Sequence, residues 1–321
     1  MAVPQFLARF VRGILPGHSD VPRLSDISER HNVASGDLNV AAYVAGPDDP
    51  SATVVFIHGF TLAAKSYFLQ VQHLIAHHPT VRSLLMDLRG HGETGEVPPE
   101  QCTIDATADD VLAVIESLAP EGPLYLVGHS LGGHVVLNAI RRSSPEIYSR
   151  IKGVMLIATS IDSLSAQGTP QLLTTQLGDT ALEAMQNAPE MVNQFRDEMG
   201  KLLAPALAAT VFKRISTPYN LVKFHAEMIH RTPLATFIGF FDDLEHHSEV
   251  AAAERLSSLP GFVLVGNDDH VTPLSQSNRI MELWPSATLR KCDRCGHMMI
   301  LEAPTMVNEA LDDLLNQQEN P

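Results

Sequence analysis

A serine in a glycine-rich turn is the first group in this sequence that could form a covalent bond to a substrate. The segment Gly128-His129-Ser130-Leu131-Gly132 lies between an apolar run, residues 124–127, and a helical pattern, residues 131–141. Small neighbours are needed where a sharp strand-to-helix turn holds a serine in a strained conformation and exposes its hydroxyl. The pattern therefore predicts Ser130 as a nucleophile that requires a base to take its proton.

An acid and a base follow later in the chain, each in a loop after an expected strand. Asp268 and Asp269 follow the apolar run 262–265, and His297 follows the run 287–291. Because parallel strands end at the same edge of a sheet, these loops can approach the serine. Serine, acid and histidine in this order predict acyl transfer, in which the histidine takes the proton and the acid orients its ring.

These motifs make the chain resemble the α/β-hydrolase family from about Thr53 to the C-terminus. In that family the acid commonly stands three residues after a glycine and four before a proline. Gly266 and Pro273 therefore favour Asp269 over Asp268. Some family members place the acid after an earlier strand, which makes Asp162 a third candidate, and residues 296–304 resemble the family's histidine loop.

The resemblance also implies how a developing oxyanion would be stabilised. The backbone N–H groups of Phe60, which follows a buried strand, and of Leu131 would donate to it. We predict that the side chains of Phe60 and His129 contact the substrate. In another turn that matches the family, we expect Asp87 and Arg89 to tie loops together.

Short apolar runs alternate with helical patterns after residue 30, which predicts an α/β fold: a mostly parallel sheet with helices on both faces. A hairpin is expected first, over residues 31–34 and 38–45. Buried strands are then expected at residues 53–57, 81–86, 124–127, 154–158, 262–265 and 287–291. Helices are expected over residues 105–119, with Thr103 or Asp105 as N-cap, over 233–246 as a crossover helix, and over 304–316.

A stretch without strand signals interrupts this alternation between residues 160 and 231. We predict a helical cap there, a core made of residues 31–159 and 232–321, and an N-terminal extension, residues 1–30. Long apolar cap side chains are expected to roof the pocket and to favour an apolar acyl or alkyl ester. They are Leu172, Leu173, Leu177, Met185, Met191, Met199, Leu202 and Leu203.

The composition excludes some partners. With 22 basic and 37 acidic residues, the formal net charge of −15 argues against nucleic acid. No apolar run reaches the roughly 18 residues of a membrane span. Residues 5–15 are amphipathic and predict either a short packed helix or a weak contact with a membrane surface.

The three cysteines give no disulfide framework, which fits a reducing compartment, and we predict a cytoplasmic protein. Cys292 and Cys295 have the spacing of a metal or redox pair. One such pair is a weak zinc signal, so incidental thiols are favoured over a disulfide that would strain the loop of His297.

The sequence thus predicts a serine hydrolase of the carboxylesterase or lipase kind, acting on a small-molecule ester without a metal or an organic cofactor. Perhydrolase, carbon–carbon bond hydrolase and acyltransferase activities use the same three residues in this family and stay open. A ligand receptor without turnover is the alternative outside enzymes.

Overall fold

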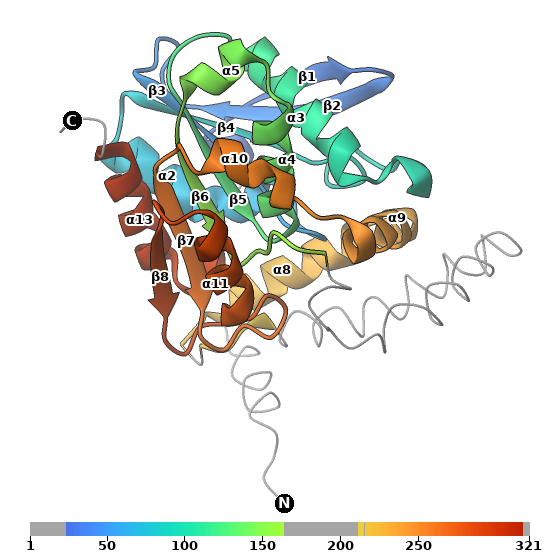
Figure 1. Cartoon of the computed structure of the whole chain (residues 1–321). Coiled ribbons are helices and arrows are strands. Elements are labelled where there is room, and N and C mark those ends of the chain that lie inside the picture. Colours follow the sequence, from blue (N-terminus) through green and yellow to red (C-terminus); the bar gives the residue numbers. More distant parts are fainter. Residues whose placement is uncertain (1–23, 164–210, 215, 317–321) are drawn as a thin grey trace, which may run out of the picture.

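The computed structural model describes residues 24–163, 211–214 and 216–316. Its strands are β1 (Glu29–Ser35), β2 (Leu38–Ala45), β3 (Ala52–Ile57), β4 (Val81–Met86), β5 (Leu124–His129), β6 (Ile151–Ile157), β7 (Gly261–Gly266) and β8 (Thr288–Cys292). They form one sheet in the order β1-β2-β4-β3-β5-β6-β7-β8 (Figure 1). Only the pairs β1–β2 and β2–β4 are antiparallel. The predicted mostly parallel sheet is confirmed, with each expected strand within three residues of its predicted ends. The strand expected to be buried at residues 287–291 requires a correction, because β8 lies at the edge of the sheet and only Cys292 in it is buried.

Helices connect most of the parallel strands. They are α2 (Phe68–His77), α3 (Ile104–Leu118), α4 (Leu131–Arg142), α5 (Pro145–Arg150), α8 (Tyr219–Arg231), α9 (Leu234–His246), α10 (Ala253–Leu256), α11 (Leu274–Leu283), α12 (Met299–Glu302) and α13 (Pro304–Asn316). Of the two candidate N-caps of α3, Thr103 caps the helix, because its side chain accepts a hydrogen bond from the N–H of Ala106 at 3.2 Å. Asp105 lies in the first turn and accepts from the side chain of Asn138 instead.

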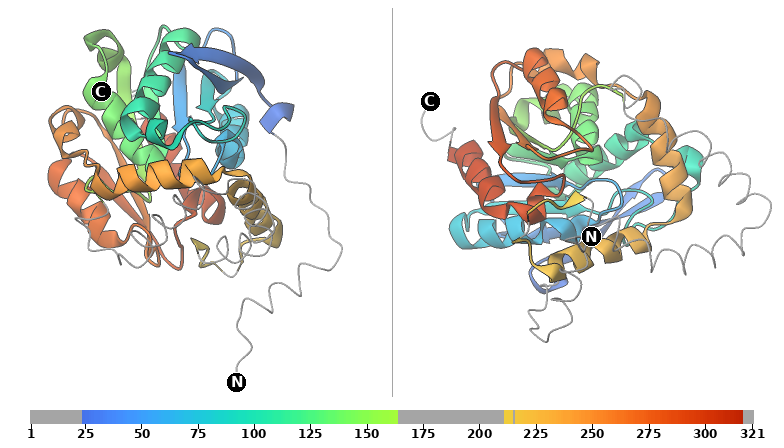
Figure 2. Two further views of the ribbon diagram at one scale, coloured as in Figure 1. Left: turned by 90° about the vertical axis from the view of Figure 1, so that its right-hand side faces the viewer. Right: turned by 90° about the horizontal axis from the view of Figure 1, so that it is seen from below.

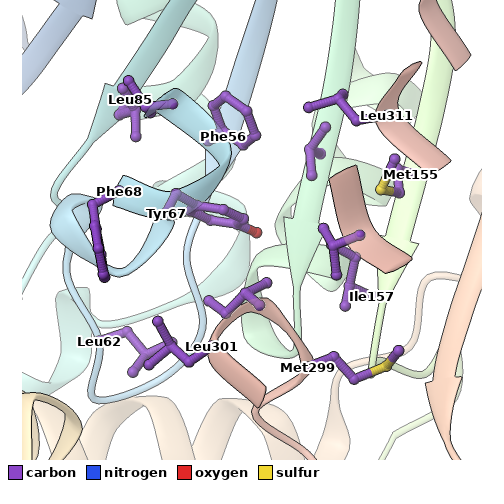
Figure 3. Packing of buried hydrophobic residues seen from close by; sticks show 14 of the residues in the cluster. Phe56, Leu62, Tyr67, Phe68, Leu85, Met155, Ile157, Met299, Leu301 and Leu311 are labelled. Atoms are coloured by element: carbon purple, nitrogen blue, oxygen red, sulfur yellow. The ribbon is translucent and has the colours of Figure 1, made fainter. Parts of the chain in front are cut away.

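Both faces of the sheet are buried along its central strands β3, β5 and β7. Along β3, Val54 and Phe56 pack in the cluster under α2, α12 and α13, while Val55 and Ile57 pack in the cluster under α3 and α4. Figure 3 shows the first cluster, in which Tyr67 lies beside Phe56. A strand that is buried on both faces needs apolar residues at every position, which explains the continuous apolar run in the sequence.

The helix predicted over residues 233–246 forms, but its place differs from that of an ordinary crossover helix. Thr236 of α9 donates to the carbonyl of Gly90 at 2.8 Å, and the ring of Phe237 lies 5.0 Å from that of Phe60. Figures 1 and 2 show α8 and α9 across one end of the sheet, the end toward which β8 points. Gly239 permits this packing, since a Cβ there would lie 2.1 Å from the carbonyl of Pro99 of the 3₁₀ helix η3 (Pro99–Gln101).

Several predictions fall outside the described residues: the segment 5–15 and the cap side chains between Leu172 and Leu203. The division into core and cap therefore stays a prediction. Within the described ranges, no helix combines the length and the apolar character that crossing a bilayer requires. Cys102, Cys292 and Cys295 are buried free thiols, as favoured from the sequence.

Candidate active site

Ser130 occupies the turn between β5 and α4, as the sequence predicts. Its backbone has φ 54° and ψ −120°, a conformation that residues other than glycine rarely adopt. Two glycines make this turn possible. A Cβ on Gly132 would lie 2.1 Å from the carbonyl of Ile57, and one on Gly128 would lie 2.4 Å from the carbonyl of Gly132. The turn therefore holds the serine at the carboxyl end of the sheet, with its neighbours packed too closely for larger residues.

The structure brings Ser130, His297 and Asp269 into one chain of hydrogen bonds. The Ser130 hydroxyl donates to Nε2 of His297 at 2.9 Å, and Nδ1–H of His297 donates to Oδ2 of Asp269 at 2.9 Å. Of the other two candidate acids, Asp162 pairs with Arg279 at 3.3 Å, and Asp268 makes no hydrogen bond to the histidine. The geometry thus matches the predicted nucleophile, base and acid.

Asp269 is buried and held by its own turn. Its Oδ1 accepts from the backbone N–H groups of Val271 and Thr272 at 2.8 and 3.0 Å, and its Oδ2 accepts from the Thr272 hydroxyl at 2.8 Å. Burial raises the pKa of this carboxyl, but the interactions with His297 and Thr272 outweigh burial, so that the pKa lies below its usual value. Asp269 is therefore a carboxylate that can stabilise a positively charged imidazole. No sequence pattern marks Thr272 as part of the site.

The two segments that carry the predicted oxyanion donors both lie beside Ser130. A Cβ on Gly59 would lie 3.1 Å from Cβ of Ser130, so the loop after β3 packs against the serine. Leu131 is the first residue of α4, whose N-terminal end carries partial positive charge. Within the described part of the chain, neither the N–H of Phe60 nor that of Leu131 has an acceptor. Both donors are free to bind a developing negative charge.

His129 requires a correction. We predicted that it contacts the substrate, but its side chain is buried at 1% exposure, and its Nε2–H donates to the carbonyl of His297 at 2.9 Å. The physical reason is the alternation along β5, which turns His129 into the structure when Ser130 faces the site. Burial, together with the neighbouring His297, lowers the pKa of His129 to about 3. A neutral His129 therefore supports the loop of His297 through this hydrogen bond.

Asp87 and Arg89 tie loops together, as predicted. Asp87 accepts from the Tyr43 hydroxyl at 2.9 Å and from the N–H of Ala64 at 2.7 Å. Arg89 makes two 2.8 Å hydrogen bonds to Asp110 of α3. These contacts fix the turn after β4 beside the loop that carries Phe60.

Three residues near His297 were not found from the sequence. The carbonyl of Val211 accepts from the N–H of His297 at 3.0 Å. Glu302 is buried and accepts from the N–H of Gly296 at 2.8 Å. His225 of α8 is buried, and burial followed by the effect of His297 lowers its pKa to about 3. No local sequence pattern marks these residues as parts of the site.

A pocket of about 230 Å³ adjoins the histidine. It lies between the segment 211–214 and the loop after β7, and its lining mixes apolar and charged side chains. The lining residues are Val211, Lys213, Asp268, His270, Val271 and His297.

Comparisons with known proteins agree with this fold. Residues 54–310 match the model of the "Alpha/beta hydrolase family". A Caulobacter protein provisionally named carbamate hydrolase RutD is 24% identical over 271 residues, which cover 84% of this chain and 93% of that protein. A Haemophilus influenzae protein provisionally named 2-succinyl-6-hydroxy-2,4-cyclohexadiene-1-carboxylate synthase is 27% identical over 234 residues, or 71% and 85% of the two chains.

A solved structure of a thermophilic esterase from Thermogutta terrifontis, with malate bound, superposes with a TM-score of 0.69. The match covers 90% of this chain and 98% of the esterase at 22% identity. At this identity the likeness establishes the fold.

Proposed function

Because the chain belongs to the alpha/beta hydrolase family, we propose that it hydrolyses a carboxylic ester through an acyl-enzyme on Ser130. The observation that carries the proposal is the chain of two 2.9 Å hydrogen bonds from Ser130 through His297 to Asp269. A serine hydroxyl becomes a strong nucleophile only when a positioned base accepts its proton. Hydrolases and esterases among the relatives and structural neighbours support the reaction class.

In the proposed reaction, Oγ of Ser130 attacks the ester carbonyl while Nε2 of His297 takes the hydroxyl proton. The N–H groups of Phe60 and Leu131 stabilise the oxyanion of the tetrahedral intermediate. Nε2–H then protonates the leaving alcohol, the C–O bond of the ester breaks, and the acyl-enzyme remains. Water attacks this acyl group with His297 again as base, which releases the acid and restores the serine.

An apolar acyl or alkyl ester is the substrate that we propose. Phe60 is half-buried and packs edge-on against Phe237 and at an angle against Phe240 of α9, which gives the region beside the oxyanion donors an aromatic wall. Apolar walls favour apolar groups through burial of surface. A cytoplasmic location and a membrane contact through residues 5–15 remain predictions from the sequence.

Reactions other than ester hydrolysis are the second candidate function, because one relative is named as a synthase. Acyl transfer, perhydrolysis and carbon–carbon bond cleavage use the same nucleophile and base. In acyl transfer and perhydrolysis another acceptor takes the place of water, and in carbon–carbon bond cleavage another bond takes the place of the ester bond. A receptor that binds such a compound without turnover is the non-enzymatic alternative.

The test is hydrolysis of p-nitrophenyl esters, from acetate to long-chain acyl, by the wild type and by Ser130→Ala. We expect the wild type to hydrolyse part of the series and the variant to lose several orders of magnitude in kcat, up to about 10⁶. Ser149→Ala, an exposed serine of α5, is the matched control and should retain activity. If the wild type is no faster than Ser130→Ala on every ester, ester hydrolysis is wrong and the other classes take precedence.

A further inference from the structure

Two histidines and an aspartate meet on the surface where α2 packs against α13. We propose that His73, His78 and Asp312 form a binding site for Zn²⁺ or a similar borderline divalent transition-metal ion. The site is separate from the proposed chemistry of Ser130, and its role is to join α13, which follows the histidine loop, to α2.

The ligand atoms already converge. Nε2 of His73 and Nε2 of His78 lie 2.7 and 2.8 Å from the same oxygen, Oδ1 of Asp312, and the three atoms lie within 4.8 Å of one another. Tetrahedral Zn²⁺ has bonds of about 2.0–2.2 Å to such atoms, which places neighbouring ligand atoms about 3.3 Å apart. The ligands therefore need to separate by about half an ångström. The side chains are 16%, 19% and 31% exposed, so that rotation at the surface can provide this movement.

The surrounding charge favours a cation. α2 ends at His77, and His78 is its C-cap, so the negative end of the helix dipole lies at the site. Asp312 lies in the C-terminal half of α13, one turn before its end, where its negative charge opposes the dipole of its own helix. Among the described residues, Asp312 has no lysine or arginine partner, whereas the adjacent Asp313 pairs with Arg290. A bound cation supplies the positive charge that no lysine or arginine provides to Asp312.

A second cluster shows what distinguishes this site. Atoms of Asp105, His247 and Glu249 also lie within 4.8 Å of one another. Glu249, however, already accepts from Asn138 at 2.6 Å and from the guanidinium of Arg141 at 3.1 Å. A fixed positive charge on the carboxylate opposes a metal ion, so we assign no site there.

The donor set determines the class of metal. Two imidazole nitrogens and one carboxylate oxygen suit Zn²⁺, Co²⁺, Ni²⁺ and Cu²⁺, whereas Mg²⁺ and Ca²⁺ prefer oxygen ligands alone. On binding, each imidazole moves its proton from Nε2 to Nδ1 and offers the Nε2 lone pair to the metal. The sequence alone predicts no metal, because Asp312 lies 234 residues after His78 and no local motif joins them.

The test is calorimetric titration of chelator-treated, full-length protein with ZnCl₂ and, separately, with MgCl₂. All proteins carry His297→Ala, so that zinc at the candidate active site does not contribute. We expect one equivalent of Zn²⁺ to bind and to raise Tm, and Mg²⁺ to do neither. Asp312→Asn and His78→Gln should each weaken Zn²⁺ binding more than about tenfold, since loss of even an outer-shell partner costs 10–100-fold.

His246→Gln is the matched control, because His246 is an exposed imidazole at the end of α9 and is not one of the three ligands, whereas the ring of His77 stacks on that of His73. It should bind Zn²⁺ like its parent, and Co²⁺ should give the visible absorption of a tetrahedral site in the parent and in His246→Gln only. The proposal is overturned if Zn²⁺ binds the parent no more tightly than Asp312→Asn and His78→Gln, or if His246→Gln weakens binding as much as they do.

Discussion

Two adjacent carboxylates at the end of β7 differ in what they can do for His297. Asp269 is 3% exposed, and its oxygens accept from the imidazole and from the turn that follows. Asp268 is half-buried and lines the pocket, and its backbone N–H donates to the carbonyl of Cys295. One residue can therefore orient the histidine, while its neighbour shapes the rim of the site.

Asp269→Asn tests this difference directly. We expect it to reduce kcat by about 10⁴, because an amide in this place holds the imidazole in the wrong tautomer. Asp268→Asn, the matched control one residue earlier, should change kcat only a few-fold. The rate of labelling by a fluorophosphonate probe reports the reactivity of Ser130 even before a substrate is known, and circular dichroism checks the fold. A larger loss in Asp268→Asn than in Asp269→Asn would reverse the assignment of the acid.

The loop that carries His297 is held by the helix α12, which follows it in the sequence, and by the distant segment 211–214. Glu302, in the short helix α12, accepts from the N–H groups of Lys213, Arg214 and Gly296. The N–H of His297 in turn donates to the carbonyl of Val211. A single buried carboxylate thus joins the segment 211–214 to the histidine loop.

Glu302→Gln should loosen this junction. The amide keeps one acceptor oxygen but turns an NH₂ group toward backbone donors, and loss of a buried charge-assisted hydrogen bond costs about 1.5–3 kcal/mol. We expect urea unfolding to show a loss of that size, and kcat to fall under conditions in which the variant is fully folded. Glu309→Gln, an exposed position on α13, should stay within about 0.5 kcal/mol. Equal stability of Glu302→Gln and Glu309→Gln would show that the junction contributes nothing.

The elements that carry the site were predictable because their signals are local. A strand that is buried on both faces needs apolar residues, and β7, which is buried at every position, extends its predicted apolar run 262–265 by one residue at each end. The start of α3 follows from Thr103, whose side chain caps the helix. The elbow at Ser130 needs small neighbours within two residues, and these are visible in the sequence.

The contacts around the site could not be predicted in the same way. The role of His129 depends on which way its ring points. A sequence shows this only where polar and apolar residues alternate along a strand, and β5 is buried at every position. Glu302 and Val211 hold the histidine loop by its backbone N–H groups, which carry no signal in the sequence because nearly every residue has one. The position of α9 over Phe60 depends on contacts with distant segments such as the turn at Gly90, and the apolar periodicity of α9 does not show whether it packs on the face or on the end of the sheet.

At the scale of the whole molecule, an unusual number of histidines is buried without charge. Burial is the largest cause of a lowered pKa in each of five: about 4 for two of them and about 3 for three. They are His58, His91, His129, His134 and His225. The hydrogen bonds agree with neutral rings. In His58, Nδ1–H donates to the carbonyl of Gly59 while Nε2 accepts from the N–H of Leu88.

From the lowered pKa values of these histidines, we expect acid to unfold the protein over a narrow range of pH. The unfolded chain binds protons at the ordinary histidine pKa of about 6.5, while the folded protein does not until the pH nears 3 to 4, so stability is lost as the pH falls below 6.5. At pH 5.5 each histidine removes about 1.4 kcal/mol, and five remove about 7 kcal/mol, which rivals the ~5–15 kcal/mol stability of a typical domain. His247, whose pKa the contact with Glu249 raises despite burial, offsets part of this loss.

Urea unfolding between pH 8 and pH 5 measures the effect. The midpoint should fall steeply below pH 6.5, with a slope that approaches several protons taken up on unfolding. His225→Phe keeps a ring in the same space and removes one titrating group whose Nδ1 has no partner among the described residues, so it should lower that slope by about one proton. A midpoint that stays constant from pH 8 to pH 5.5 would mean that the buried histidines already share protons with groups that keep them charged. In that case the acid sensitivity would have to come from carboxylates such as Asp269, whose lowered pKa removes stability only near pH 4 and below.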